Sequence, residues 1–383
     1  MNASPFGFFR GAAALMAGDL ATMLTTGLGV QLCGDAHVKN LGAYAAPDGH
    51  LVFDLNDFDE TIPGPWEWDV KRLATSLVVA GSEAGGGKRD GATAVRAFVE
   101  SYRESMDRFS WMKVIELAKW EVRRHTASGP VRAVLQKAER ATPEVTLKKL
   151  TVRSRGNERR FHDRPPLLYH VPRETAEAVI ASLVPYRQTL GIDRQQALDG
   201  YRPVDVAFKV VGTGSVGTRD YVVLLLGERP DDALFLQVKE ELPSCYARYL
   251  RGAPAFPNQG RRVAEGQYRL QTITDPFVGW TSIGGSDYLV RQLADHKAVV
   301  DPAELKGAAL IEYGLVCGET LAKAHARTGD AAAIAGYCGG STKLDKAIAR
   351  FALAYAEQTE SDHAALRAAI KSGKLKAADG PWI

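Results

Sequence analysis

The sequence predicts an α+β protein with two lobes, one largely helical and one built on a five-stranded antiparallel sheet. Helical periodicity, with apolar residues recurring every three and four positions, dominates residues 68–150 and 302–370. Between these regions, from about residue 203, short β-rich runs alternate with turn residues, which is typical of antiparallel strands. A chain of 383 residues is long enough to form both lobes.

The elements are expected in a simple order along the chain. A helix over 1–25 and a short strand at 30–32 lead into a turn-rich segment over 34–68 with two apolar runs, and helices follow up to residue 150 and again over 173–190. The five strands of the sheet are expected at residues 204–211, 220–227, 233–240, 276–281 and 287–293, with one helix at 260–271 between the third and fourth strands.

Bulk composition argues against several classes of protein. The net charge of +3 is too small to indicate a nucleic-acid partner, and the longest apolar runs, such as residues 221–226, are far too short to span a bilayer. No basic region precedes the apolar stretch of the N-terminus, which argues against a secretory signal. The four cysteines lie far apart and form no CxxC pair. We therefore expect a cytoplasmic protein with no nucleic-acid or membrane partner.

The densest group of chemically active residues lies in CGDAHVKNLGAY and FDLNDFDETIPGPWEWD. Asp35 and Asn40 share a loop after a short strand, and Asp57 follows later, at the end of a strand pair. Phosphoryl transfer needs a carboxylate that orients or deprotonates the attacking hydroxyl, and oxygen ligands that hold Mg²⁺ on the phosphates. We expect Asp35 to take the first role and Asn40 and Asp57 the second. The simpler alternative is that Asp and Asn merely favour turns.

The neighbouring polar residues have less specific interpretations. His37 is either a structural hydrogen-bonding residue, which is the commoner role of a lone histidine, or a metal ligand or acid–base group. Asp54 and Asp59 either cap turns or support the metal from behind its ligands. Asp69 begins a helix and is most simply explained as the N-cap of that helix.

A second group of residues lies in VVGTGSVGTRDYVVLLLG. It contains Gly212, Gly214 and Gly217 in the spacing G-x-G-x-x-G, with Ser215 between the last two. Because β-rich runs flank the glycines on both sides, they fit a kinase-type hairpin over phosphates better than the strand-to-helix turn of a dinucleotide fold. An ordinary glycine-rich turn remains the alternative.

Lys239 lies beyond these glycines, late in the next strand but one. A lysine at this place in a kinase-type β lobe can reach the α- and β-phosphates of ATP, although a strand often ends in an exposed lysine. An acidic partner for Lys239 is expected from the following helix. Glu265 is the best placed, with Glu240 and Glu241 as alternatives.

Together these motifs resemble a known bacterial family. GDAHVKN followed by FDLNDFDETIPGPWEWDVKRLATSL is similar to the signature of the family catalogued as domain of unknown function 2252. The resemblance extends through VGTGSVGTRDYVVLLLG, LQVKEELPS and LAKAHARTGD. Members usually carry further residues ahead of the segment that resembles SPFGFFRGAA, so we expect this chain to be a short or trimmed version.

The same pieces are similar to aminoglycoside phosphotransferases and choline kinases. The G-D-x-H-x-x-N loop of those enzymes, with a catalytic Asp and a metal-binding Asn, matches Asp35 and Asn40, and an I-D-F type motif with the second metal ligand matches Asp57. The resemblance further implies that Asp69 stabilises the loop. It also implies that His325, in LAKAHA, lies on the helix that precedes the loop in those enzymes.

This chain departs from those enzymes in two ways. Cys33 occupies the position before Gly34, where those families usually have a histidine that helps to order the loop. The glycine hairpin and Lys239 follow the catalytic loop at a long distance in the sequence, whereas in those enzymes they precede it. We therefore expect a protein-kinase-like fold that is circularly permuted, which preserves the site if the original ends can be joined.

The permuted arrangement assigns a role to each part of the chain. Residues 1–200 are expected to carry the catalytic and metal loops together with a helical insert at 90–200. Residues 201–300 are expected to form the nucleotide-binding β region, and residues 301–383 a helical tail that completes the helical lobe.

The function predicted from these motifs is ATP- and Mg²⁺-dependent phosphate transfer to a hydroxyl of a small molecule. A small acceptor is expected because the loop lacks the arginine that protein kinases place before the catalytic Asp. Three alternatives remain. They are a kinase-like AMP transferase, a nucleotide-binding regulator with little turnover, and a metal-dependent hydrolase built on His37, Asp35, Asp54 and Asp57.

A basic stretch between predicted helices bears on the nature of the acceptor. It is either a solvated loop or a contact for an anionic substrate, and it is formed by Arg153, Arg155, Arg159, Arg160 and Arg164. In the second interpretation, the insert at 90–200 closes over a compact, anionic acceptor whose identity the sequence does not give.

Overall fold

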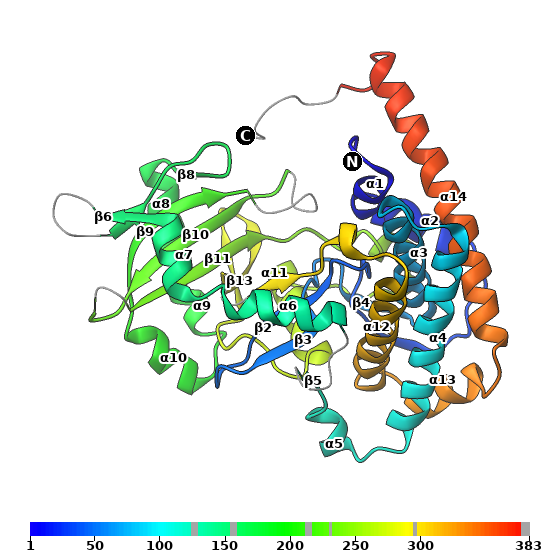
Figure 1. The fold of residues 1–383 in the computed structure, drawn as a ribbon. Coiled ribbons are helices and arrows are strands. Elements are labelled where there is room, and N and C mark those ends of the chain that lie inside the picture. The colour runs from blue at the N-terminus through cyan, green and yellow to red at the C-terminus, as the bar shows by residue number, and fades with distance from the viewer. Residues whose placement is uncertain (124–128, 154–158, 211–216, 230–231, 294–296, 377–383) are drawn as a thin grey trace.

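The structure, a computed structural model, describes residues 1–123, 129–153, 159–210, 217–229, 232–293 and 297–376. Figure 1 shows two lobes side by side, a β-rich lobe on the left and a helical lobe on the right. Antiparallel sheets and long helices together make a mixed α+β fold, as predicted. Among the described residues, no helix combines the length and the apolar character that a membrane crossing requires.

Fourteen α-helices and two short 3₁₀ helices occur in the described residues. They are α1 (Pro5–Gly11), α2 (Ala13–Ala21), α3 (Glu67–Glu83), α4 (Lys88–Ser110), α5 (Val114–Ala118), α6 (Gly129–Glu139), α7 (Pro143–Leu150), α8 (Arg173–Ala181), α9 (Leu183–Arg187), α10 (Ile192–Asp199), α11 (Gln259–Leu270), α12 (Ala308–Ala326), α13 (Ala331–Cys338) and α14 (Lys343–Lys371), with η2 (Ala247–Tyr249) and η3 (Pro302–Glu304). The single helix expected over residues 1–25 is therefore two helices, α1 and α2.

Fourteen strands complete the described part of the chain. They are β1 (Gly29–Leu32), β2 (Leu41–Ala45), β3 (Leu51–Leu55), β4 (Ile62–Pro65), β5 (Val122–Arg123), β6 (Thr151–Arg153), β7 (Arg159–Phe161), β8 (Leu168–His170), β9 (Arg202–Lys209), β10 (Asp220–Leu226), β11 (Ala233–Glu240), β12 (Gly279–Ile283), β13 (Ser286–Gln292) and β14 (Ala298–Val299).

The main sheet of the β lobe has six strands in the order β12-β13-β11-β10-β9-β8, and all neighbours are antiparallel. The prediction of five strands was wrong by one. The sixth strand, β8, is very short and lies inside the segment expected to be helical, and it forms because it pairs with the edge of β9. So short a strand cannot show the alternating pattern that identifies a strand from sequence.

The two faces of this sheet have different coverings. Helices α8, α9 and α10 pack on one face through a cluster that includes Val179, Tyr186 and Leu198 against Val206, Val238 and other strand residues. On the opposite face, Phe235 belongs to an apolar cluster with residues of α7 and β7. Since side chains alternate along a strand, Gln237 and Lys239 continue the face of Phe235 toward the other lobe, where that face becomes polar.

The helical lobe is a tightly packed group of α3, α4, α12, α13 and α14. Gly318 of α12 shows how close the packing is, because a Cβ atom there would lie 2.3 Å from the carbonyl oxygen of Phe98 on α4. One continuous apolar cluster extends from these helices through the strands β1 to β4 and reaches α11. The lobes are therefore joined through a shared core rather than through a thin linker.

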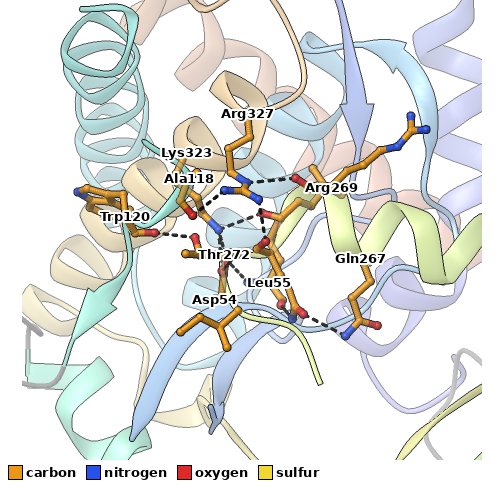
Figure 2. Close-up of polar contacts among 12 residues, drawn as sticks. Asp54, Leu55, Ala118, Trp120, Gln267, Arg269, Thr272, Lys323 and Arg327 are labelled. Atoms are coloured by element: carbon orange, nitrogen blue, oxygen red, sulfur yellow. Dashed lines mark hydrogen bonds and ion pairs between the residues drawn. The ribbon is translucent and has the colours of Figure 1, made fainter. Parts of the chain in front are cut away.

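A buried polar network fixes the junction between the lobes (Figure 2). Lys323 of α12 donates to both carboxylate oxygens of Asp54 on β3, at 2.7 and 2.6 Å, and to the carbonyl oxygen of Leu270 at the end of α11, at 3.0 Å. Both charged side chains are almost completely buried. Arg327, one turn further along the chain, donates to the carbonyl oxygens of Ala118, Arg269 and Gln271. The network thus ties α5, α11, α12 and β3 together.

This network predicts a large stability effect. Replacing one member of a buried ion pair leaves an uncompensated charge, so we expect Lys323→Ala to lower the free energy of unfolding by about 3–5 kcal/mol. The control is Lys88→Ala, because Lys88 pairs with Glu357 on the exposed surface and should leave stability unchanged. Urea unfolding followed by circular dichroism measures both variants. Native stability in Lys323→Ala would contradict the prediction, and replacing both members, as Asp54→Leu with Lys323→Met, should restore much of the loss.

Candidate functional site

The loop after β1 holds Asp35 in an unusual backbone conformation. Gly34 has φ +73°, and Asp35 has φ 67°, a left-handed value that no other described non-glycine residue adopts. Gly34 also allows close contact, because a Cβ atom there would lie 2.3 Å from the carbonyl carbon of Glu60. The loop that carries Asp35 is therefore pressed against the segment that follows Asp57. Backbone strain of this kind is concentrated at functional sites.

The side chain of Asp69 supports this loop through hydrogen bonds. Its buried carboxylate accepts hydrogen bonds from the backbone N–H groups of Cys33, at 2.7 Å, and Gly34, at 3.3 Å. The expectation that Asp69 stabilises the loop agrees with these contacts, whereas the N-cap interpretation was wrong, because α3 begins at Glu67 with Trp66 as its N-cap. Asp69 lies in the first turn of α3 with its side chain directed to the loop.

A histidine from the other end of the chain completes this support. His325 of α12 places Nε2 3.3 Å from the Asp69 carboxylate and Nδ1 2.9 Å from the hydroxyl of Tyr102. Both Asp69 and His325 are fully buried. His325 thus places an imidazole next to Asp69, which binds the backbone N–H of Cys33.

The side chain of Asp35 is held by a buried arginine. Arg72 of α3 donates its Nε–H to Asp35 Oδ1 at 2.5 Å, and its other nitrogens contact the carbonyl oxygen of Phe9 and the sulfur of Met16. Burial raises the pKa of Asp35 to about 7, although Arg72 opposes the rise. Since the side chain keeps about a fifth of its surface exposed, Asp35 can still be reached by a ligand. A carboxylate that titrates near neutral pH suits proton transfer.

Asn40 and Asp57 lie beside Asp35. Asn40 donates its side-chain amide to the carbonyl oxygen of Asp35 at 2.9 Å, which leaves its own Oδ1 without a hydrogen bond inside the described ranges. The N–H of Asn56 donates to the carbonyl oxygen of Asn40 at 2.9 Å. The residue after Asn56 is Asp57, so the two expected metal ligands stand at neighbouring ends of the β2–β3 hairpin.

Unpaired carboxylate oxygens mark the same place. Oδ1 of Asp57 and Oδ1 of Asp59 are buried and have no hydrogen-bond partner in the described part of the chain. Burial acts to raise the pKa of Asp57, but the nearby charges of Lys239, Arg291 and Lys297 outweigh it, and the pKa lies below its ordinary value. Ionised carboxylate and amide oxygens are the ligands that Mg²⁺ prefers. The residues present therefore fit a magnesium ion. Within the described residues, no three His, Cys, Asp or Glu side chains form a metal-binding group by themselves.

Lys239 reaches these carboxylates from the β lobe. Its Nζ contacts Asp59 Oδ2 and lies 3.5 Å from Glu241. The nearby negative charges outweigh the effect of burial and raise the pKa of Lys239, so the ammonium stays charged. The structure thus brings Asp35, Asn40, Asp57 and Lys239 together although Lys239 lies far along the sequence.

The prediction that Glu265 pairs with Lys239 was wrong. Glu265 forms ion pairs with Arg261 at 2.6 Å and Arg269 at 3.9 Å on the outer face of α11. The inner face of the same helix carries Arg262, which donates to the carbonyl oxygens of Asp59, Thr61 and Leu242. Glu265, three residues after Arg262, lies only about 60° away around the helix, so their partners separate the two side chains: Arg262 binds the loop after Asp57, whereas the Glu265 carboxylate is engaged by Arg261 and Arg269.

The remaining predicted residues are placed as follows. Gly212, Gly214 and Ser215 lie outside the described residues, while Gly217 has φ +92° and no described atom within 4 Å of the position of a Cβ. Asp54 binds Lys323 through both carboxylate oxygens and also accepts hydrogen bonds from the backbone N–H groups of Leu55 and Thr272. His37 accepts from the backbone N–H of Lys39, and burial, with Arg10 and Arg72 nearby, lowers its pKa well below the ordinary value. It is therefore a neutral, structural hydrogen-bonding residue.

A cleft of about 510 Å³ includes Asn56, the residue before Asp57, in its lining, whereas Asp35, Asn40, Asp57 and Lys239 are not among the described residues that line it. It lies between the polar end of the six-stranded sheet and the β2–β3 hairpin, and Asn56, Gln237, Gln267 and Gln271 contribute to its lining. Three cations, Lys209, Arg291 and Lys297, also line it. The sequence analysis did not single out these cations. The available signal was weak, namely polar residues at alternate positions in otherwise apolar strands, as in VAFK and LQVKE.

The basic stretch lies elsewhere. Among its described residues, none lines the cleft, and Figure 1 shows β6 and the connected strand β7 at the end of the β lobe farthest from the helical lobe. Arg160 of β7 lies 3.9 Å from Asp205, and Arg159 donates to Thr151. Arg155 lies outside the described residues. The interpretation of this stretch as a cover over the acceptor therefore has no support from its position.

The fold and this site define a mixed α+β protein in which carboxylates, an asparagine and a buried lysine meet next to a cationic cleft. A family model described as an uncharacterized protein conserved in bacteria, DUF2252, matches residues 1–369, so the chain belongs to that family. No curated protein and no solved structure matches the chain.

The loop support can be tested directly. Asp69→Ala removes two charge-assisted hydrogen bonds and leaves buried N–H groups unpaired, so we expect the free energy of unfolding to fall by about 3 kcal/mol. The backbone amides of Cys33 and Gly34 should also exchange hydrogen faster. The control is Asp330→Ala, because Asp330 caps α13 through the N–H of Ala333 and touches no part of this loop. Unchanged amide exchange at Cys33 and Gly34 in Asp69→Ala would show that the contact does not order the loop.

Proposed function

We propose that this protein is an ATP- and Mg²⁺-dependent transferase with a circularly permuted, kinase-like arrangement, and that it transfers phosphate to a hydroxyl of a small molecule. The observation that carries the proposal is the meeting of three separate segments. Asp57 offers an unpaired, ionised oxygen, Asn40 an available carbonyl oxygen, and Lys239 a buried ammonium group in the same small volume. Triphosphate bound through a metal needs this set of groups.

The order of elements in the β lobe supports the same interpretation. The glycine-rich part of the sequence lies between the antiparallel strands β9 and β10, and Lys239 lies on the adjacent strand β11. Helix α11 follows and contacts the metal loop through Arg262. In protein kinases a glycine-rich loop covers the phosphates and a lysine follows on the third strand. Here the catalytic loop comes earlier in the chain but reaches the lysine in space.

Each residue has a definite task in this proposal. Asp35 accepts the proton of the acceptor hydroxyl, since its Oδ2 is not used by Arg72 and its pKa lies near 7. Lys239 neutralises phosphate charge, exchanging its contact with Asp59 for the ligand. Asn40 and Asp57 would hold Mg²⁺, which supplies charge neutralisation between the phosphates. Arg262 and Asp69 keep the two loops in place.

The geometry of the site bears on two alternative functions, the hydrolase and the AMP transferase. The hydrolase interpretation loses support because Asp54 is bound by Lys323 through both carboxylate oxygens, although His37 Nε2 lies 3.9 Å from Asp35 Oδ2. The AMP transferase interpretation becomes the second candidate. In this proposal the cleft receives either the base or the phosphate chain of ATP. Cations line the cleft, and their positive charge favours the phosphate chain over the base.

Binding and chemistry should separate in two variants. Asp57→Ala removes a metal ligand, so we expect Mg²⁺-dependent ATP binding to weaken by at least about tenfold. Asp35→Asn keeps binding but loses most transfer, because the amide cannot accept the hydroxyl proton. Calorimetry measures binding. Mass spectrometry of the protein and of small molecules after incubation with ATP and Mg²⁺ distinguishes phosphate transfer, AMP transfer and no transfer.

The control for both variants is Asp48→Ala, an exposed aspartate in the turn between β2 and β3. It should bind ATP and transfer phosphate as the native protein does. Native affinity for ATP and Mg²⁺ in Asp57→Ala would remove the metal role of Asp57. Full transfer by Asp35→Asn would remove the proposed base.

The pH dependence of transfer gives a separate test of Asp35. Its pKa is raised to about 7 by burial, and only the ionised carboxylate accepts a proton. At saturating nucleotide we therefore expect the transfer rate to rise about tenfold per pH unit below this value and to level off above it. Asp35→Asn should show a low rate without this rise. If native transfer is independent of pH between about 5 and about 8, another group is the base.

A further inference from the structure

The cleft lined in part by Asn56 has an excess of positive charge. Lys209 lies at the end of β9, Arg291 on β13 and Lys297 in the segment before β14, and all three line the cleft. Among the described residues, the lining contains one carboxylate, Asp275, which is engaged by the backbone N–H groups of Phe277 and Gln292. Three cations from three elements thus face one shared space.

The donors of these cations are largely unused. Within the described ranges, neither the Nζ of Lys209 nor that of Lys297 makes a hydrogen bond or an ion pair. Arg291 donates its Nε–H to the side chain of Gln237 at 2.9 Å, and its Nη atoms have no hydrogen bond there. Partly buried donors without partners carry a desolvation cost that a bound acceptor can remove.

One buried amide side chain also points to an anionic ligand. Asn56 lines the cleft and is more than nine-tenths buried, and its Nδ2 donor has no hydrogen-bond partner among the residues that the structure describes. Gln267 differs, because its amide nitrogen already donates to Gln271 (Figure 2) and its unpaired Oε1 is an acceptor, which a phosphate oxygen cannot pair with. Buried polar atoms in native proteins are normally paired, so groups that lack a partner at a cleft wall indicate a missing one.

The acidic groups near the cleft do not cancel this charge. Asp220 lies near Lys209 but accepts a hydrogen bond from Gln237. Asp57 and Asp59 act on Lys297 electrostatically, yet burial and the charge of Arg291 still lower the pKa of Lys297 to about 7. The described carboxylates therefore relieve the mutual repulsion among the cations only in part. An anion in the cleft would relieve it.

We propose that this cleft is a phosphate-binding site, in which Lys209, Arg291 and Lys297 hold a phosphate group or a polyphosphate chain next to the metal centre. The cavity and the unused donors, Nδ2 of Asn56 among them, carry this inference. It uses the nucleotide site proposed above for its location, but phosphate binding can be measured without any transfer. The shared chemistry has two sources, the phosphate chain of the nucleotide itself or a phosphate carried by the acceptor.

Tripolyphosphate without metal is the probe for this site. We expect Lys297→Gln and Arg291→Gln each to weaken its binding by about tenfold or more, because each removes charge-assisted hydrogen bonds. The controls are Lys88→Gln and Arg173→Gln, which change exposed cations that pair with Glu357 and Glu177. Calorimetry measures affinity. Because the Nζ of Lys297 makes no hydrogen bond or ion pair within the described residues, Lys297→Gln should keep native thermal stability.

A competition experiment between tripolyphosphate and a nucleotide identifies the source of the phosphate. Tripolyphosphate binding is repeated with saturating Mg²⁺ and a non-hydrolysable ATP analogue. Competition assigns the site to the phosphates of the nucleotide. Simultaneous binding that still depends on Lys297 assigns it to a phosphorylated acceptor. Either result supports a phosphate site.

Two results would overturn the inference. One is native affinity for tripolyphosphate in both Lys297→Gln and Arg291→Gln, and the other is no binding of tripolyphosphate by the native protein. These failures differ from a failure of the proposed function. If tripolyphosphate binding requires Lys297 but neither phosphate nor AMP is ever transferred, the site stands and the transferase proposal falls.

Discussion

The ion pair between Asp54 and Lys323 is the constraint on which the arrangement of the site depends. Asp54 lies just before Asp57 in the sequence, Lys323 just before His325, and the same ammonium binds the end of α11 at Leu270. One buried contact therefore ties together the end of β3 before Asp57, the helix α12 that supports the Asp35 loop, and the helix α11 whose Arg262 binds the loop after Asp57. Because burying two charges has a large desolvation cost, we attribute to this pair a role in fixing relative position rather than a net gain in stability.

Around this junction, the loops are held by backbone hydrogen bonds to charged side chains. Asp69 binds the N–H groups that precede Asp35, and Arg262 binds the carbonyl groups that follow Asp57. The Asp69 carboxylate thus accepts from the N–H groups of one loop, and the Arg262 guanidinium donates to the carbonyl groups of the other. Oδ1 of Asn40 and Oδ1 of Asp57 are left without a hydrogen bond within the described chain. Positions held in this way are preorganised for a ligand.

Much of this could be predicted from sequence because the signals are local. The period of apolar residues indicated the long helices and five strands of the main sheet, and Asp35, Asn40 and Asp57 lie in two short motifs that the structure joins through one hairpin. Glu265 could not be placed in the same way. The choice between two faces of α11 depends on how that helix packs against residues 59–61, where Gly266 lies too close to Thr61 for any side chain. That contact joins segments far apart in the sequence, so no local pattern indicates it.

The cationic cleft could not be predicted for a related reason. Lys209 and Arg291 each look like the polar end of a solvated strand, and Lys297 lies outside any motif. Only the sheet order, with β13 beside β11 and β9 two strands further, brings their charges to one face.

The charges in the cleft also link the binding site to protonation. Lys239 has Asp59 as a direct partner, but Lys297 faces Arg291 across the cleft lining and keeps a pKa of about 7. A phosphate group placed between these cations would favour the charged form of Lys297 and so raise its pKa. Binding an anion at neutral pH would then take up a proton, and affinity would fall as pH rises past the free pKa of Lys297. Asp35 changes in the opposite sense, since it must lose its proton to act as a base. In the proposed mechanism, phosphate would therefore bind best below neutral pH and a hydroxyl would be deprotonated best above it, so their combined action would be greatest where the two ranges overlap.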